Sequence, residues 1–116
     1  MKRIANALLA GAMLAAAALA GCGWQDISSF PCPAAGTTLT YANFGQAFFF
    51  KYCVQCHGCP NGYSSRAFTD VNTIRSQAAD IFRNAAEDNT SMPPGPDNPP
   101  KSERYQLAEW LACGAP

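Results

Sequence analysis

Ten residues in the middle of the chain, KYCVQCHGCP (51–60), hold three of the six cysteines and the only histidine. Thiols and an imidazole this close together can form a disulfide, bind zinc, exchange thiol for disulfide or attach a haem. Within the cluster, Cys53, Cys56 and His57 spell C-x-x-C-H, the spacing typical of c-type haem attachment. Two thiols one helical turn apart add to the two haem vinyl groups, and the adjoining histidine reaches the iron.

Two other chemistries explain the cluster less well. A redox-active C-x-x-C pair needs a strand leading into the motif and gives His57 no role. A structural zinc site needs four ligands, usually from two separated pairs. Cys53 and Cys56 with His57 or Cys59 supply part of such a set, but the sequence has no second C-x-x-C or H-x-x-x-H. The sequence therefore favours one covalent haem c.

Haem iron in an electron carrier takes a second axial ligand, which is frequently methionine. Met92 lies in SMPPGP (91–96), and the other two methionines precede residue 21. It has no apolar neighbours such as a core methionine would have, and the prolines that follow restrict its backbone. We predict that Met92 is the second ligand. Its competitors are Lys51, Lys101, the tyrosines, the remaining cysteines and an exogenous molecule.

The first 22 residues read as an export signal. Lys2 and Arg3 precede an apolar run, 7–20, which is shorter than the roughly 20 residues that span a membrane. The sequence LAGC that ends at Cys22 resembles the lipobox of bacterial lipoproteins, which implies cleavage before Cys22 and a lipid on its thiol. The alternative is an ordinary secretory signal with a coincidental cysteine. Either reading predicts export, and the first predicts a lipid-anchored protein that faces the periplasm or the cell exterior.

The remaining chain is predicted to form a tether and arm, 22–40, and one folded domain, 41–116. Eight basic residues balance eight acidic ones, and removal of the signal 1–21 leaves an acidic excess. Nucleic acid is therefore excluded as a partner, since its binding needs basic patches. A domain this small, with nine prolines and nine glycines, gains stability from a cofactor or a disulfide.

Apolar residues at helical spacing predict three helices and no strand. The first runs from a cap at Asn43 to about residue 54, the second from a cap at Asp70 to about 86, and the third from Ser102 to about 113, where Gly114 suits the stop. Residues 87–101 contain five prolines and are predicted to be non-helical. The predicted core residues are Phe44, Ala47, Phe48, Val71, Ile74, Ala78, Ile81, Phe82, Ala85, Leu107, Trp110 and Leu111.

Together these features resemble class I cytochromes c. Gly45, Phe49 and Cys53 match the Gly-x-x-x-Phe-x-x-x-Cys pattern of the family's N-terminal helix, and Leu107 with Trp110 match the Leu-x-x-aromatic pattern of its C-terminal helix. The resemblance covers about residues 41–114. It implies an all-α cytochrome c fold, in which three main helices surround one covalent haem and the first and last helices cross. Gly45 would allow their close approach, with Phe49 and Trp110 stacked at the contact.

The resemblance also implies a function, that of an electron carrier and not an enzyme. It would move single electrons between redox proteins that bind transiently, and would take no small-molecule substrate. The alternatives are a haem-based sensor or gas-binding module, and a haem subunit of a larger oxidoreductase. Arg75, Arg83 and Trp24 are candidate propionate ligands. The acceptor of the His57 ring N–H stays open, because Pro60 is closer than the proline that many family members use.

Three cysteines remain, an odd number for an exported protein. If the first and last helices cross, the arm before one and the end of the other meet, so we favour a disulfide between Cys32 and Cys113. The alternative pair is Cys32 with Cys59.

Overall fold

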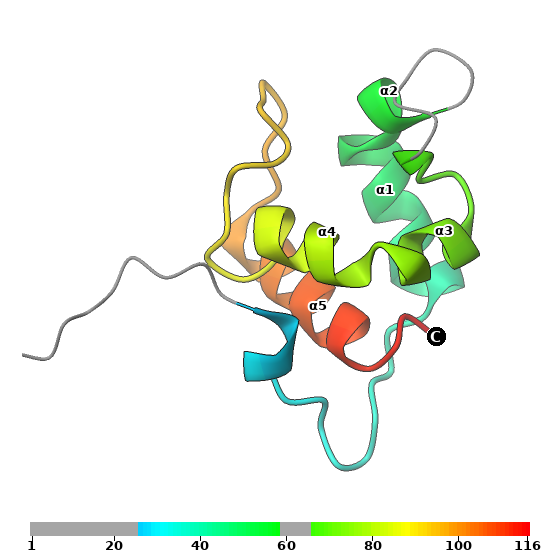
Figure 1. Ribbon diagram of the computed structural model, residues 1–116, viewed down its shortest axis with the longest axis vertical. Coiled ribbons are helices and arrows are strands. Elements are labelled where there is room, and N and C mark those ends of the chain that lie inside the picture. Colours follow the sequence, from blue (N-terminus) through cyan, green and yellow to red (C-terminus); the bar gives the residue numbers. More distant parts are fainter. Residues whose placement is uncertain (1–25, 59–65) are drawn as a thin grey trace, which may run out of the picture.

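A computed structural model describes residues 26–58 and 66–116. The export signal, Cys22, Trp24, Cys59 and Pro60 lie outside the described residues. In the described ranges the chain is helical and has no strand, which confirms the all-α prediction. None of these helices is long and apolar enough to cross a membrane. The elements, in chain order (Figure 1), are η1 (Ile27–Ser29), η2 (Tyr41–Gly45), α1 (Gln46–Tyr52), α2 (Val54–His57), α3 (Val71–Ser76), α4 (Ala78–Ala85) and α5 (Lys101–Ala112).

The first helical segment comprises η2, α1 and α2. Its cap is Thr40 and not the predicted Asn43: the Thr40 hydroxyl accepts the Asn43 N–H, and the Asn43 side chain accepts the Thr40 N–H. This reciprocal pair adds one turn before the expected start, and the turn is π-helical, with the Gln46 N–H donating to the Tyr41 carbonyl. A break at Cys53, where φ is −121°, separates α1 from α2. The helical segment is therefore interrupted at the first cysteine of the motif.

The second helical segment begins where the sequence predicts. Oδ2 of Asp70 accepts the Thr73 N–H at 2.9 Å, as a cap does. The expected single helix is broken at Gln77 (φ −106°, ψ 10°) into α3 and α4. The predicted apolar stripe nevertheless faces the core on both sides of the break. Ile74, Ile81, Phe82 and Ala85 are buried, and Val71 and Ala78 pack against them.

The last helix, α5, starts at Lys101 and has Pro100 at its cap position. It ends as predicted at Gly114, whose φ of +88° suits glycine. The N–H of Gly114 donates to the Leu111 carbonyl at 3.0 Å, and the N–H of Ala115 donates to the Trp110 carbonyl at 2.8 Å. These two bonds form a Schellman motif, which satisfies carbonyls that the helix end would leave open.

The first and last helical segments meet at Gly45 and Trp110. A Cβ atom on Gly45 would lie 2.7 Å from a carbon of the Trp110 ring, so only glycine allows this approach. Phe49 packs beside Trp110 with ring centroids 6.2 Å apart, and both side chains are fully buried. The rings are tilted by 56° and are not stacked as expected. The crossing that the resemblance implies is thus present, with a tilted aromatic contact at its centre.

The N-terminal arm is fastened to this core. Cys32 and Cys113 form a disulfide across a sequence separation of 81 residues. The Phe30 ring packs edge-on against Phe82 and Tyr105, at centroid distances of 6.1 Å and 6.4 Å. The disulfide and these rings attach the arm to α4 and α5.

Candidate functional site

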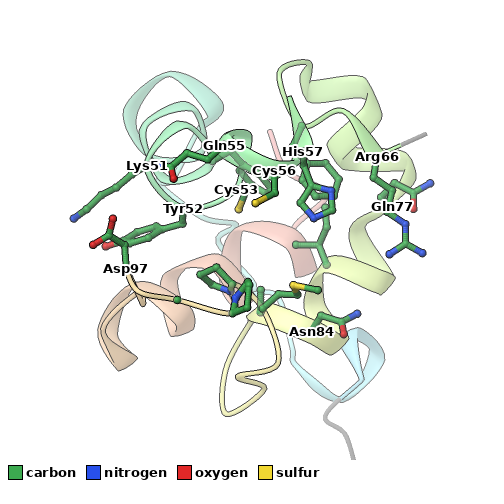
Figure 2. A pocket seen from close by; sticks show the side chains of 18 of the residues that line it. Lys51, Tyr52, Cys53, Gln55, Cys56, His57, Arg66, Gln77, Asn84 and Asp97 are labelled. Atoms are coloured by element: carbon green, nitrogen blue, oxygen red, sulfur yellow. The ribbon is translucent and has the colours of Figure 1, made fainter. Parts of the chain in front are cut away.

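The four predicted haem-binding residues line one pocket. Cys53, Cys56 and His57 lie on the α1–α2 side, and Met92 belongs to the loop between α4 and α5. The cavity measures about 280 Å³. Figure 2 shows both cysteines and the histidine directed toward it, and Figure 1 shows the loop across from α2. Residues far apart in sequence therefore approach one cavity from two walls.

Neither Cys53 nor Cys56 forms a disulfide, so both sulfurs are available for other bonds. Cys53 is half-buried and Cys56 is exposed. Burial raises the pKa of the Cys53 thiol to about 12, and the positive charge of Arg104 opposes this effect. A thiolate is therefore disfavoured here, whereas a thioether carries no charge and suits the same position. Across 26–58 and 66–116, no three His, Cys, Asp or Glu side chains are grouped so as to hold a metal ion.

His57 is oriented by the chain that returns after the motif. Its carbonyl accepts the Phe68 N–H at 2.8 Å, and its ring lies 4.8 Å from the Phe68 ring. Burial lowers the pKa of His57, the Arg66 guanidinium lowers it further, and a hydrogen bond with the Arg66 backbone acts in the opposite direction. Because the two lowering effects outweigh the opposing one, the imidazole favours its neutral form. A neutral imidazole is also the form that ligates iron.

Met92 projects from a loop without regular structure, yet its backbone is well anchored. Its N–H donates to the Asn84 carbonyl at 2.8 Å, and its carbonyl accepts from Nη1 of Arg104 at 2.9 Å. Met92 lines the pocket and is 43% exposed as a residue. Both neighbouring helices, α4 and α5, therefore position this residue.

The pocket suits a flat apolar group with charged substituents. Aromatic, aliphatic and proline side chains form much of its wall, and polar side chains lie around it (Figure 2). Together with two thiols on one wall and a histidine and a methionine on opposite walls, this composition fits a covalently bound haem. The apolar residues are Phe49, Phe68, Ile81, Ala85, Pro93, Pro94 and Pro96, and the polar ones include Lys51, Gln55, Arg66, Gln77, Asn84 and Asp97.

The structure changes the expected propionate contacts. Arg75 donates to the Ala115 carbonyl at 3.0 Å, and Arg83 pairs with Asp80 at 3.6 Å, so neither lines the pocket. Arg66 lines it instead. The sequence gives no signal for Arg66, because this arginine lies in a stretch without periodicity.

Arg104, unlike Arg66, leaves a signal in the sequence that was not used in the prediction of the site. Arg104 precedes Leu107 and Trp110 at helical spacing, which places a charged residue on the buried face of α5. A cation on such a face is unusual and indicates a specific structural task.

Comparison with known families agrees with this geometry. The family model described as "Cytochrome C oxidase, cbb3-type, subunit III" matches residues 42–111, more than half of the chain and a range that includes all four predicted haem-binding residues. Neither the curated proteins nor the solved structures yield a match. The chain therefore belongs to the cbb3-type cytochrome c oxidase subunit III family, as a monohaem c-type cytochrome domain that binds haem c covalently.

Proposed function

We propose that this protein carries single electrons between redox proteins, with Cys53 and Cys56 as the thioether residues and His57 and Met92 as the axial ligands. The observation that supports this assignment best is the single pocket lined by all four side chains, with Met92 across from the C-x-x-C-H wall. Membership of the family indicates that the domain takes part in electron transfer. The identity of the ligands and the role as a carrier are our proposal.

For the proposed electron transfer, the protein needs only to hold the haem and to shield it from water. The bound haem supplies an iron that gains or loses one electron. His57 and Met92 would both hold the iron, which would leave no position open to a small molecule. The apolar wall limits access of water to the site, and the hydrogen bonds on both sides of Met92 restrict movement of this ligand. We therefore propose no substrate and no enzymatic turnover.

The charges around the pocket determine how strongly electrostatic attraction can contribute to the docking of a redox partner. Lys51 and Arg66 are matched by Asp80 and Asp97, so no single sign dominates this part of the described surface. We propose that donor and acceptor dock through a small, transient surface of the kind usual for redox encounters. Because the charges balance, rates measured by stopped flow should change little with ionic strength.

A second candidate is a permanent haem subunit of a larger oxidase, which the description of the matched family favours. Purification in mild detergent separates the two. A carrier is recovered as a single chain, whereas a subunit stays with its neighbours at constant stoichiometry.

We further propose that the protein is exported and held to a bacterial membrane by lipid on Cys22, facing the periplasm or the cell exterior. The LAGC sequence supports this location. The mass of the mature N-terminal peptide tests it: a lipid-modified Cys22 is expected in the native protein. A Cys22→Ser variant should stay unprocessed or be released from membranes.

The decisive test of function is optical and mass measurement after expression with a haem-attachment system. The intact mass should include one haem. The ferric protein should show the absorption band at the red end of the visible spectrum that reports iron–sulfur ligation, and Met92→Ala should lose it. Rapid binding of carbon monoxide to the reduced wild-type protein would instead identify a sensor or gas-binding module.

A further inference from the structure

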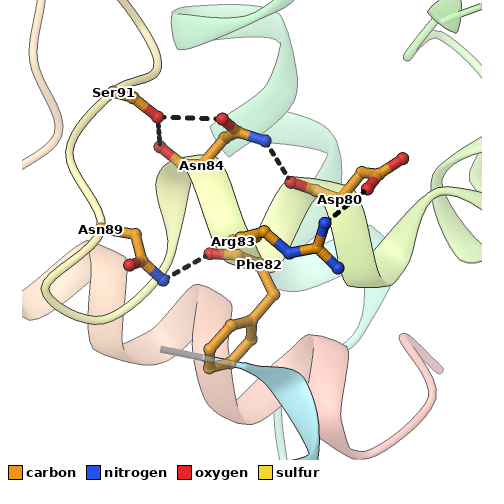
Figure 3. A network of polar contacts seen from close by, with 6 residues as sticks. All are labelled: Asp80, Phe82, Arg83, Asn84, Asn89 and Ser91. Carbon is orange, nitrogen blue, oxygen red and sulfur yellow. Dashed lines mark hydrogen bonds and ion pairs between the residues drawn. The ribbon is translucent and has the colours of Figure 1, made fainter. Parts of the chain in front are cut away.

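The loop that carries Met92, residues 86–100, lacks regular secondary structure, so other groups must satisfy its backbone. On one side these groups come from α4 (Figure 3). The Ser91 hydroxyl lies 2.9 Å from Oδ1 of Asn84 and 3.2 Å from the Asn84 carbonyl, which also accepts the Met92 N–H. Nδ2 of Asn89 donates to the Phe82 carbonyl at 3.0 Å. The loop thus folds back on the last turn of α4.

On the other side, one side chain of α5 gathers the loop. Nη1 of Arg104 donates to the carbonyls of Ala85, Asn89 and Met92, at 2.7, 3.1 and 2.9 Å. A guanidinium nitrogen carries two hydrogens, so three acceptors at this distance must share them. The end of α4, the start of the loop and Met92 therefore converge on one atom. The Arg104 carbonyl also accepts the Glu87 N–H at 3.0 Å.

The burial of Arg104 shows that this arrangement is specific. The residue is 5% exposed, and its side-chain hydrogen bonds in the described part of the chain go to carbonyl oxygens. Burial of a charge is unfavourable unless hydrogen bonds satisfy it. The Ala85 carbonyl belongs to the last turn of α4, where open carbonyls attract a cation. The guanidinium thus provides hydrogen-bond donors for carbonyl groups that regular secondary structure would otherwise satisfy.

We propose that Arg104 is a positioning residue that holds the Met92 loop against the pocket and so limits displacement of the Met92 sulfur by other ligands. This inference rests on the proposed function in one respect, namely that Met92 is the axial ligand. The bonds that fix the loop do not depend on that assignment, so the two claims can fail separately.

The test compares Arg104→Gln with Arg83→Gln in the haem-loaded protein. Both changes remove one positive charge, but Arg83 is half-exposed and pairs with Asp80 on the surface. Loss of charged hydrogen bonds should speed hydrogen exchange of the Met92 amide by about tenfold or more in Arg104→Gln, because such bonds contribute more than the roughly 1.4 kcal/mol that a tenfold change requires. Carbon monoxide should bind the reduced Arg104→Gln protein at least about tenfold faster for the same reason. Arg83→Gln should leave both rates at the wild-type value.

Arg104→Lys keeps the charge but loses the planar fork, and it decides the question if Arg104→Gln does not fold. It should also speed Met92 exchange relative to Arg83→Gln. Exchange and carbon monoxide rates equal to those of Arg83→Gln in every folded Arg104 variant would overturn the proposal. Survival of the sulfur band in Met92→Ala would instead reject Met92 as the ligand, and the Met92 amide would still report whether Arg104 holds the loop.

Discussion

The two walls of the pocket are built in different ways. On one wall, Cys53, Cys56 and His57 lie within five consecutive residues, and a short helix places them. On the other, Met92 stands in a proline-rich loop that depends on hydrogen bonds from α4 and on Arg104 of α5. The first wall is specified by local sequence and the second by tertiary contacts. Substitutions in α4 or α5, far from Met92 in sequence, should therefore disturb the Met92 wall and leave the wall of Cys53, Cys56 and His57 unchanged.

The largest expected effect removes the local wall altogether. In a Cys53→Ser, Cys56→Ser double variant no thioether can form, so covalent haem should be lost completely. Met92→Ala, the matched change on the other wall, should keep the covalent haem and lose only sulfur ligation. Intact mass after denaturation distinguishes the two. Covalent haem in the double variant would contradict the assignment of both cysteines.

Removal of the disulfide should lower the stability of the whole domain and should not act on one wall of the pocket more than on the other. Cys32→Ser with Cys113→Ser opens a loop with a separation of 81 residues. Such a crosslink contributes about 4 kcal/mol by restricting the unfolded chain. Denaturant unfolding should show a loss of this order while the haem spectrum in the folded state is retained. A spectrum that loses the sulfur band would show that the arm acts on the Met92 wall directly.

Gly45→Ala tests the crossing that supports the His57 wall. The added Cβ would lie 2.7 and 2.8 Å from two carbons of the buried Trp110 ring. Overpacking of this kind costs about 1–3 kcal/mol of unfolding free energy. The control is Ala47→Ser, at an exposed position of the same helical segment, which should change stability little. Equal stabilities for the two variants would mean that the Trp110 ring can move aside.

The smallest effect concerns the Asp70 cap at the start of α3. The pKa of Asp70 lies below its ordinary value of 3.8, chiefly because the carboxylate accepts a hydrogen bond from the Thr73 backbone. The ionised cap therefore stabilises the fold above pH 3.8, and this contribution disappears as the pH falls through the lower folded-state pKa. Asp70→Asn can still cap the helix but cannot titrate, so its acid-unfolding midpoint should depend less on this group. Identical acid-unfolding curves would show that other groups dominate.

The sequence predicts the local features of this molecule better than the tertiary ones. Four of the predicted features depend only on residues that are neighbours in sequence: C-x-x-C-H, the Asp70 cap, the apolar stripe of 71–85 and the stop at Gly114. The structure has the cap, the stripe and the stop where they were expected. The helix breaks at Cys53 and Gln77 have no proline or glycine at the break that would predict them from the sequence. Their positions depend on packing, which periodicity does not contain.

The contributions of the two arginines show the same limit at the site. Arg66 reaches the pocket because the chain returns past His57, and Arg104 reaches Met92 because α4 and α5 pack together. Neither contact follows from spacing along the chain. Arg104 alone left a trace, as a charged residue on an apolar helix face.

The attachment of the arm has a consequence for orientation. Figure 1 shows η1 at one end of the molecule, with α2 and the Met92 loop at the other. Cys32 and Phe30 fasten the arm to Cys113 and Phe82, so the described part of the arm is held on the side of the domain that carries η1. With the proposed lipid on Cys22, the domain would stand on the bilayer with its cofactor directed into the aqueous space. Partners would then approach from the side of the pocket, away from the bilayer.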